Sequence, residues 1–180
     1  MEVAFHPWVE GLENIPADGP AIIASNHLSF SDSILLPIAV PRKITFLAKA
    51  EYFNAPGIKG KAMAAFFSGT GQVPVDRTGG NAGTAAIATG VRLLREGHLL
   101  GIYPEGTRSP DGRLYRGKTG VARMALESRV PVIPVGLHNT DKVQPVGRRR
   151  PNFNVQVGLR IGKALDFSRY YGMEIGRAHV

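Results

Sequence analysis

The sequence predicts an α/β fold, in which a single domain holds a mostly parallel, twisted central sheet flanked by helices. Two observations support this prediction. Short apolar runs of strand length alternate with helical segments along the chain, which is the order expected when helices connect parallel strands. The chain has 180 residues, 43% of them hydrophobic and 20% charged, enough for one domain with a substantial core. We expect this domain to span residues 9–170.

The expected elements of the first half are short strands and one short helix. In order, they are a strand and turn over 9–20, a buried strand over 21–25, a helix from Asp32 to about Val40, a strand over 44–48 and a strand over 71–77. Pro37 lies inside the helix and indicates a short or kinked element.

The second half is richer in helix. In order, the expected elements are a helix over 82–96 stopped by Gly97, a buried strand over 99–103, a turn over 110–112, a helix over 120–128, and strands over 132–137 and 155–161.

The segment 58–68 has two interpretations. It combines Lys59 and Lys61 with Met63, Phe66 and Phe67. Core packing is the default for such an apolar stripe. The alternative is contact with a membrane surface, because a short helix that is both basic and apolar suits a lipid interface.

Charge and composition restrict the partners. The chain has 22 Lys and Arg residues against 14 acids, a net charge of +8, which favours an anionic partner such as nucleic acid, a phosphate-bearing substrate or an anionic membrane surface. The few aromatic residues are not interleaved with basic ones and no zinc-finger or RNP pattern occurs, so we expect no nucleic acid. The chain has no cysteine, which excludes disulfides, thiolate metal sites and a cysteine nucleophile.

No segment reaches the ~18 apolar residues that a membrane span needs. The first residues lack the basic start and the long apolar run of a signal peptide. We therefore expect a cytoplasmic protein that lies peripherally on the inner face of the membrane.

The heptapeptide Asn26-His27-Leu28-Ser29-Phe30-Ser31-Asp32 carries the parts of a general base. Positions i and i+5 do not share a helix face, so His27 and Asp32 meet only if the chain bends between them, with His27 in a loop and Asp32 in the first helical turn. Asp32 would then hold one imidazole nitrogen and leave the other free to accept a proton. The alternative is that the polar residues are turn and cap residues and His27 is a surface histidine.

Three polar clusters follow expected strands: His27 with Asp32, Asp76 with Arg77, and the segment 105–109. Ligands of open α/β sheets bind beyond the carboxyl ends of the strands, so the clusters are expected to converge on one site.

The third cluster has the parts of a phosphate-binding loop. Gly106 permits close backbone approach, Thr107 and Ser109 supply hydroxyls, and Arg108 supplies a guanidinium fork. Arg77 and Lys118 would add positive charge. Considered singly, these residues also fit ordinary roles, with Arg77 paired to a surface acid, Lys118 solvated and Glu105 ion-paired to an arginine.

Four motifs, in this order, resemble those of the glycerolipid acyltransferases typified by bacterial 1-acylglycerol-3-phosphate acyltransferase. They are Asn26 to Asp32 with its histidine and aspartate, Gly71 to Arg77, Glu-Gly-Thr-Arg-Ser at 105–109, and the proline-containing segment Val130 to Val135. The resemblance extends from Val9 to about Tyr170.

This resemblance implies transfer of a fatty acyl group from acyl-CoA or acyl carrier protein to the sn-2 hydroxyl of 1-acylglycerol-3-phosphate (lysophosphatidic acid), giving phosphatidic acid. It implies no metal, and no cofactor besides the thioester co-substrate. His27 would be the general base and Asp32 would orient it. The acceptor phosphate would be bound by Arg77, Glu105, Gly106, Thr107, Arg108 and Lys118. Because like charges repel, Glu105 would act through an arginine or the glycerol.

Other interpretations stay open. The acceptor could be another lysophospholipid or a glycolipid, or the chain could be a non-catalytic membrane-surface module. A phosphohydrolase is a third alternative, although no metal-ligand spacing favours it. The donors for a thioester oxyanion are not identified by the sequence.

Both ends depart from the family pattern. Members commonly carry an N-terminal helical segment and a C-terminal helix, whereas only eight residues precede Val9 here and we expect no helix after Tyr170. The last six residues, Ile175 to Val180, resemble the translation of a sequencing adapter, so we expect them to be an artefact and the chain to be cut short there.

Overall fold

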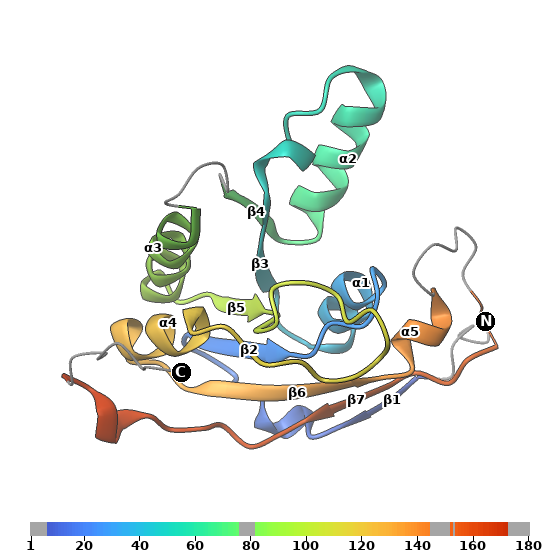
Figure 1. Ribbon diagram of the computed structural model, residues 1–180. Helices are drawn as coiled ribbons and strands as arrows, with labels where there is room; N and C mark the ends of the chain where they lie inside the picture. The colour runs from blue at the N-terminus through green and yellow to red at the C-terminus, as the bar shows by residue number, and fades with distance from the viewer. Residues whose placement is uncertain (1–6, 76–81, 145–151, 153, 173–180) are drawn as a thin grey trace.

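The computed structural model describes residues 7–75, 82–144, 152 and 154–172, and within them the chain forms one sheet with helices on both faces (Figure 1). The strands are β1 (Trp8–Glu10), β2 (Ala21–Ser25), β3 (Ile44–Lys49), β4 (Gln72–Val75), β5 (Leu99–Ile102), β6 (Val132–His138) and β7 (Gly158–Ile161). Their spatial order is β1-β7-β6-β2-β5-β3-β4, and every neighbouring pair is parallel except β6 and β7. The predicted α/β fold with a mostly parallel sheet is confirmed.

The helices agree closely with the expected ranges. They are α1 (Asp32–Ala39), α2 (Gly57–Gly69), α3 (Ala82–Arg95), α4 (Gly120–Ser128) and α5 (Thr140–Val143), with 3₁₀ turns at Leu12–Asn14, Ala50–Tyr52 and Ser168–Tyr170. Gly97 has a φ of 89°, the left-handed conformation expected for the glycine after α3. The single turn of α5 has too few residues for a helical period and was not expected.

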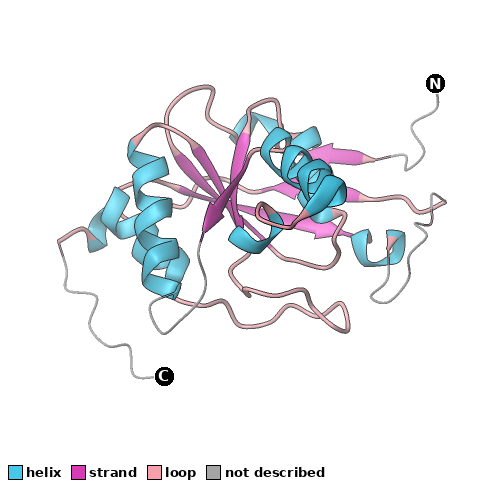
Figure 2. Ribbon diagram, turned by 90° about the horizontal axis from the view of Figure 1, so that it is seen from above, coloured by secondary structure: helices cyan, strands magenta, loops and turns pink. Residues whose placement is uncertain are grey.

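Alternate residues of the central strands belong to different cores, as strand geometry requires. Ile23 and Leu99 pack with Leu36 of α1 on one face of the sheet. Ile22 and Leu100 pack with Leu94 of α3 on the other face, where Met124 of α4 joins them. Figure 2 shows the strands fanned by their twist, with helices to either side. Two covered faces explain why these strands are continuous apolar runs.

The last strand is shorter than expected. β7 begins at Gly158, where the sequence predicts a strand from residue 155. Its partners explain the difference, because Gly158 pairs with Trp8 at the start of β1 and with His138 at the end of β6. In this register residues 155–157 lie opposite positions before Trp8 and after His138, which are outside the two strands, although the carbonyl of Val157 still accepts the N–H of Trp8.

β4 is an edge strand of the sheet, and it contains a proline. Pro74 pairs with Ala48 of β3 and is exposed. Edge positions tolerate proline because its missing N–H removes no bond from the interior of the sheet.

Core packing was the wrong default for the segment 58–68. This segment lies in α2, which projects beyond the rest of the molecule in Figure 1. Phe67 is buried, but Met63 and Phe66 are 44% and 43% exposed.

Some expectations fall outside the described residues. They concern Asp76 and Arg77, which come after β4 in the sequence, and the segment 175–180. Among the described residues, no helix is both long and apolar enough to cross a bilayer.

Candidate active site

Two loops meet at the carboxyl edge of the sheet. β2 and β5 are parallel neighbours, with Ala24 opposite Ile102, so the segments that follow them leave the sheet side by side. These are the segments 26–31 and 103–119, which carry two of the three polar clusters. Their convergence is the arrangement expected for a ligand site in an open α/β sheet.

His27 and Asp32 are in direct contact. The Nδ1 atom of His27 lies 2.8 Å from Oδ2 of Asp32, with His27 in the loop after β2 and Asp32 as the first residue of α1. The bend between the two residues, which the sequence predicts from their spacing, is therefore confirmed. The carboxylate favours a proton on Nδ1, which leaves Nε2 as the nitrogen able to accept one.

Asp32 is fixed by its surroundings. Its carboxyl group is fully buried, and Oδ2 also accepts hydrogen bonds from the backbone N–H groups of Leu28 (2.6 Å) and Ser29 (2.8 Å). Its place at the start of α1 adds the favourable field of a helix N-terminus. Three donors converging on one oxygen leave the carboxylate a single orientation toward His27.

Tyr103 supports the imidazole from one side. The rings of Tyr103 and His27 are stacked, with centroids 3.9 Å apart and planes 12° from parallel. Burial raises the pKa of the Tyr103 hydroxyl far above its ordinary value; the neighbouring Ser33 side chain opposes this shift and the Asp32 carboxylate adds to it. The ring is therefore a neutral platform. Sequence reasoning missed it, because Tyr103 reads as the last residue of a buried strand.

Glu105 holds the two loops together. Its Oε1 accepts the backbone N–H of His27 (3.2 Å) and its Oε2 accepts that of Tyr115 (3.0 Å). The backbone N–H of Ser109 donates to the carbonyl of His27 at 2.7 Å, so the histidine backbone is bound from both sides. The family resemblance implies a Glu105 that orients an arginine or accepts a hydrogen bond from the glycerol. The contacts among the described residues are instead with backbone N–H groups, which satisfy a buried carboxylate directly.

Asn26 is a further positioning residue that the sequence did not reveal. Its side chain accepts the N–H of Leu137 (2.7 Å) and donates to the carbonyl of the same residue (3.1 Å). The Ser29 hydroxyl donates to the carbonyl of Gln144 (3.1 Å). These bonds attach the His27 loop to β6 and to the segment after α5. From the sequence, Asn26 and Ser29 have only the signal of turn residues.

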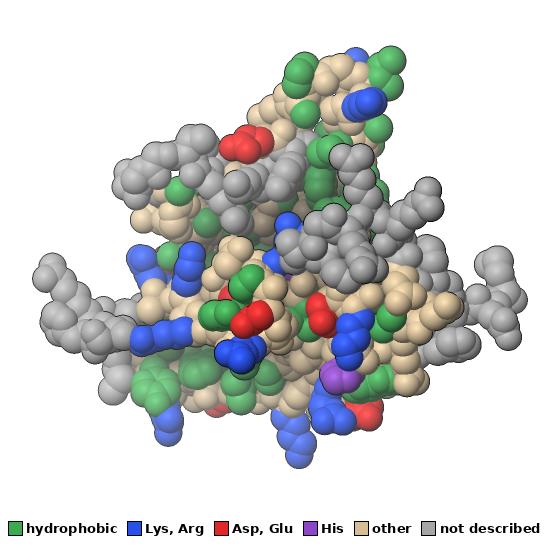
Figure 3. Space-filling model, turned by 45° about the vertical axis from the view of Figure 1, so that its right-hand side comes forward, with side chains coloured by type: hydrophobic (Ala, Val, Ile, Leu, Met, Phe, Trp, Pro, Cys, Tyr) green, Lys and Arg blue, Asp and Glu red, His purple; other side chains and the backbone are tan. Residues whose placement is uncertain are grey.

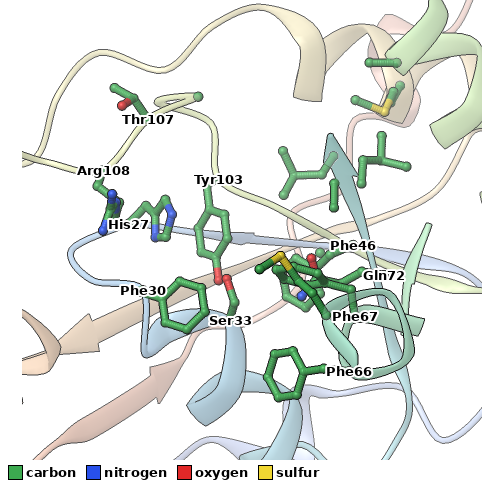
Figure 4. Close-up of a pocket in the computed structure, with 18 of the residues that line it drawn as sticks. His27, Phe30, Ser33, Phe46, Phe66, Phe67, Gln72, Tyr103, Thr107 and Arg108 are labelled. Atoms are coloured by element: carbon green, nitrogen blue, oxygen red, sulfur yellow. The ribbon is translucent and has the colours of Figure 1, made fainter. Parts of the chain in front are cut away.

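The predicted phosphate-binding residues are partly assembled. Gly106 has a φ of 75° and is in close contact with the Lys118 side chain. A Cβ atom added at Gly106 would lie only 3.1 Å from Nζ of Lys118. Thr107 and Arg108 are exposed beside His27 (Figure 4). Ser109 is buried and donates to Asp111, so its hydroxyl faces the protein. Gly106, Thr107, Arg108 and Lys118 thus lie together, while Arg77 lies outside the described residues.

An apolar cavity begins at His27. It has a volume of about 780 Å³ and extends from the loop residues toward α2 (Figure 4). Polar residues gather at one end, where His27, Thr107 and Arg108 line it. Most of the remaining lining is aromatic or aliphatic, with Ser33, Lys59 and Gln72 as its polar members. The apolar side chains include Phe30, Phe46, Leu47, Met63, Phe66, Phe67, Ile102 and Met124. The cavity therefore suits a molecule with an apolar chain and a polar reacting group.

The fold and the site define an α/β domain with a carboxylate-oriented histidine at the edge of its sheet, between a cationic loop and an apolar cavity. The chain belongs to the acyltransferase family, whose model matches residues 6–138.

Named relatives agree with this assignment. The chain is 37% identical over 140 residues to the chloroplastic 1-acyl-sn-glycerol-3-phosphate acyltransferase LPAT1 of Arabidopsis thaliana, an alignment that covers 77% of this chain and 38% of the relative. It is 37% identical over 124 residues to the 1-acyl-sn-glycerol-3-phosphate acyltransferase of Bacillus subtilis, covering 68% of this chain and 57% of the relative. The chain thus spans less than two thirds of the length of these curated relatives.

A solved structure shares the fold. It is the 1-acyl-sn-glycerophosphate acyltransferase PlsC of Thermotoga maritima, which has a TM-score of 0.71 and 29% identity to this chain. The match covers 96% of this chain and 66% of the other.

Proposed function

We propose that this chain is the catalytic domain of a 1-acylglycerol-3-phosphate O-acyltransferase. It moves a fatty acyl group from a thioester of coenzyme A or of acyl carrier protein to the sn-2 hydroxyl of 1-acylglycerol-3-phosphate. The observation that carries the proposal is the His27–Asp32 pair, 2.8 Å apart at the polar end of an apolar cavity. The relatives from Arabidopsis thaliana and Bacillus subtilis, both named 1-acyl-sn-glycerol-3-phosphate acyltransferase, support the choice of acceptor.

In this proposal His27 is the general base. Its Nε2 accepts the proton of the acceptor hydroxyl while the hydroxyl oxygen attacks the thioester carbonyl carbon. The tetrahedral intermediate then expels the thiolate, which takes the same proton back from the imidazolium. Asp32 stabilises that imidazolium, and such proton transfer typically contributes about 10²–10⁴-fold to the rate. No acyl-enzyme is required, because the substrate supplies the nucleophile.

The acceptor phosphate is assigned to the loop beside His27. Arg108 and Lys118 provide the positive charge, with Thr107 as a hydroxyl donor, and Gly106 lets the backbone come close. Arg77 is proposed as a further cation. The acyl chain is assigned to the apolar part of the cavity. This arrangement places the phosphate and the chain on opposite sides of the imidazole.

The net charge of +8 and the absence of cysteine support a cytoplasmic site of action, peripheral on the inner face of the membrane. Transfer to another lysophospholipid remains the nearest alternative, and the same assay separates the two.

Thiol release from acyl-CoA, and separately from acyl carrier protein, tests the proposal. We expect free thiol to appear only when lysophosphatidic acid is present, and His27→Ala to lower the rate by about 10²–10⁴-fold. Lys163→Ala, an exposed residue far from the site, is the control and should leave the rate unchanged. Thiol release without an acceptor, or with a neutral lysolipid alone, would contradict the proposal.

Arg108→Ala tests the phosphate assignment. Because Arg108 is exposed at the polar end of the cavity, its loss should raise the KM for lysophosphatidic acid about tenfold or more, with a smaller change in the KM for the acyl donor. Exposed Arg123→Ala on α4 is the matched control. An unchanged acceptor KM in Arg108→Ala would refute the assignment.

A further inference from the structure

Helix α2 leaves nearly all of its surface uncovered. Within this helix, Gly57–Gly69, only Gly60 and Phe67 are buried. Ile58 is 87% exposed, and Met63 and Phe66 are 44% and 43% exposed. Isolated exposed apolar residues are common, but three large ones on one short projecting helix form a patch of the kind that marks an interaction site.

The charge on α2 has one sign. Lys59 and Lys61 are exposed beside the apolar side chains, and the sequence of the helix contains no acid. Figure 3 shows hydrophobic and basic side chains together on the projecting part of the molecule. This combination favours a partner that is both apolar and anionic.

The exposed patch is continuous with the cavity. Lys59, Met63 and Phe66 belong to the surface of α2 and also line the cavity that begins at His27. Phe30, 44% exposed, lies on the same lining (Figure 4). If the cavity holds an acyl chain, which is the proposed function, the chain can pass from a bilayer into the cavity along these side chains without crossing water.

We propose that α2 is a docking surface for an anionic phospholipid bilayer. Ile58, Met63 and Phe66 enter the boundary between headgroups and acyl chains, while Lys59 and Lys61 bind lipid phosphates. An acidic protein would also attract the two lysines. The bilayer fits better, because the helix presents more large apolar side chains than cations.

Vesicle sedimentation tests the proposal with the full chain and without turnover, so that it is independent of acyl transfer. We expect binding to phosphatidylcholine vesicles that contain phosphatidylglycerol and weaker binding to phosphatidylcholine alone. Ile58→Glu should weaken binding about tenfold or more, since the side chain loses its apolar burial. Lys61→Glu should weaken it about fivefold or more and reduce its dependence on salt.

Matched controls lie on residues 163–165, at the opposite end of the molecule from α2 (Figure 1). Leu165 is 46% exposed and Lys163 is exposed, so Leu165→Glu and Lys163→Glu repeat the same chemical changes there. Both controls should bind vesicles like the parent chain. The melting temperature of each variant shows whether it is folded.

A gain of signal provides a second measurement. Ile58→Trp should give a blue-shifted emission on adding anionic vesicles, with quenching by brominated lipid, after subtraction of the parent signal from Trp8. Failure of the parent to bind vesicles, equal binding of test and control variants, or an unshifted emission would overturn the proposal. Binding to acyl carrier protein that depends on Lys61, together with no binding to vesicles, would also overturn the proposal. Vesicle binding without acyl transfer would refute only the proposed function.

Discussion

The loops around His27 and the helix α2 are built in opposite ways. The His27 loop is bonded to segments far away in sequence: His27 to Glu105, Asn26 to Leu137 and Ser29 to Gln144. Helix α2 buries only Gly60 and Phe67: Gly60 lies against Ala55 in the segment just before the helix, and the Phe67 ring contacts Phe53.

The difference reflects what each region has to do. Proton transfer requires a base held in one geometry, and the buried carboxylates of Asp32 and Glu105 both accept hydrogen bonds from the His27 loop. The docking proposed for α2 requires accessible apolar area, and Ile58, Met63 and Phe66 of this helix are exposed. The two regions should therefore differ strongly in their sensitivity to substitution.

The largest effect is expected from Asp32→Asn. The amide keeps the shape of the carboxylate but cannot stabilise an imidazolium, and its NH₂ group opposes the correct tautomer of His27. We expect kcat to fall about 10⁴-fold, the size seen when the orienting aspartate of a serine-protease triad is changed in the same way. Thiol release measures the effect. Exposed Asp166→Asn is the control, and a rate within about tenfold of the parent in Asp32→Asn would contradict the assigned role.

An intermediate effect is expected from Glu105→Gln. One of the two backbone N–H groups would then face an NH₂ group, which loosens the bond between the loops. Lost hydrogen bonds to a charged group contribute about 1.5–3 kcal/mol each. We expect kcat to fall about 10–100-fold with little change in the acceptor KM. A raised KM with an unchanged kcat would show instead that Glu105 acts on the substrate. Exposed Glu127→Gln on α4 is the control.

The smallest effect is expected from Ile58→Ser on the free energy of unfolding. Ile58 is 87% exposed, so its loss should change stability by less than about 0.5 kcal/mol in urea unfolding. Leu36→Ala on α1 provides the contrast. Because Leu36 is fully buried, this variant should lose about 2–5 kcal/mol of the free energy of unfolding. A loss above about 1 kcal/mol for Ile58→Ser would show that α2 is packed more tightly than its exposure indicates.

The sequence predicts the parts of the molecule that local rules determine. The 3.6-residue period excludes a straight helix through His27 and Asp32, so a bend was required if they were to meet. Apolar runs located the central strands, and Gly97 located the end of α3. These predictions depend only on residues that are close to one another in the sequence.

The rest depends on partners that the sequence does not pair. Glu105 bonds to a residue 78 positions away, and Asn26 to one 111 positions away. An apolar stripe does not say whether other elements cover it, which is why α2 was assigned to the core. The start of β7 likewise follows from where β1 begins and β6 ends.

Pro74 has a consequence for how copies of this chain meet one another. A parallel sheet that ends in an open strand offers its free N–H and C=O groups to any extended segment nearby, which is a route to aggregation. In β4 the proline has no N–H to give, and its exposed ring stands at the outer border of the sheet. Growth of the sheet by strands from other molecules is therefore opposed at this border, even when the protein is crowded on a surface.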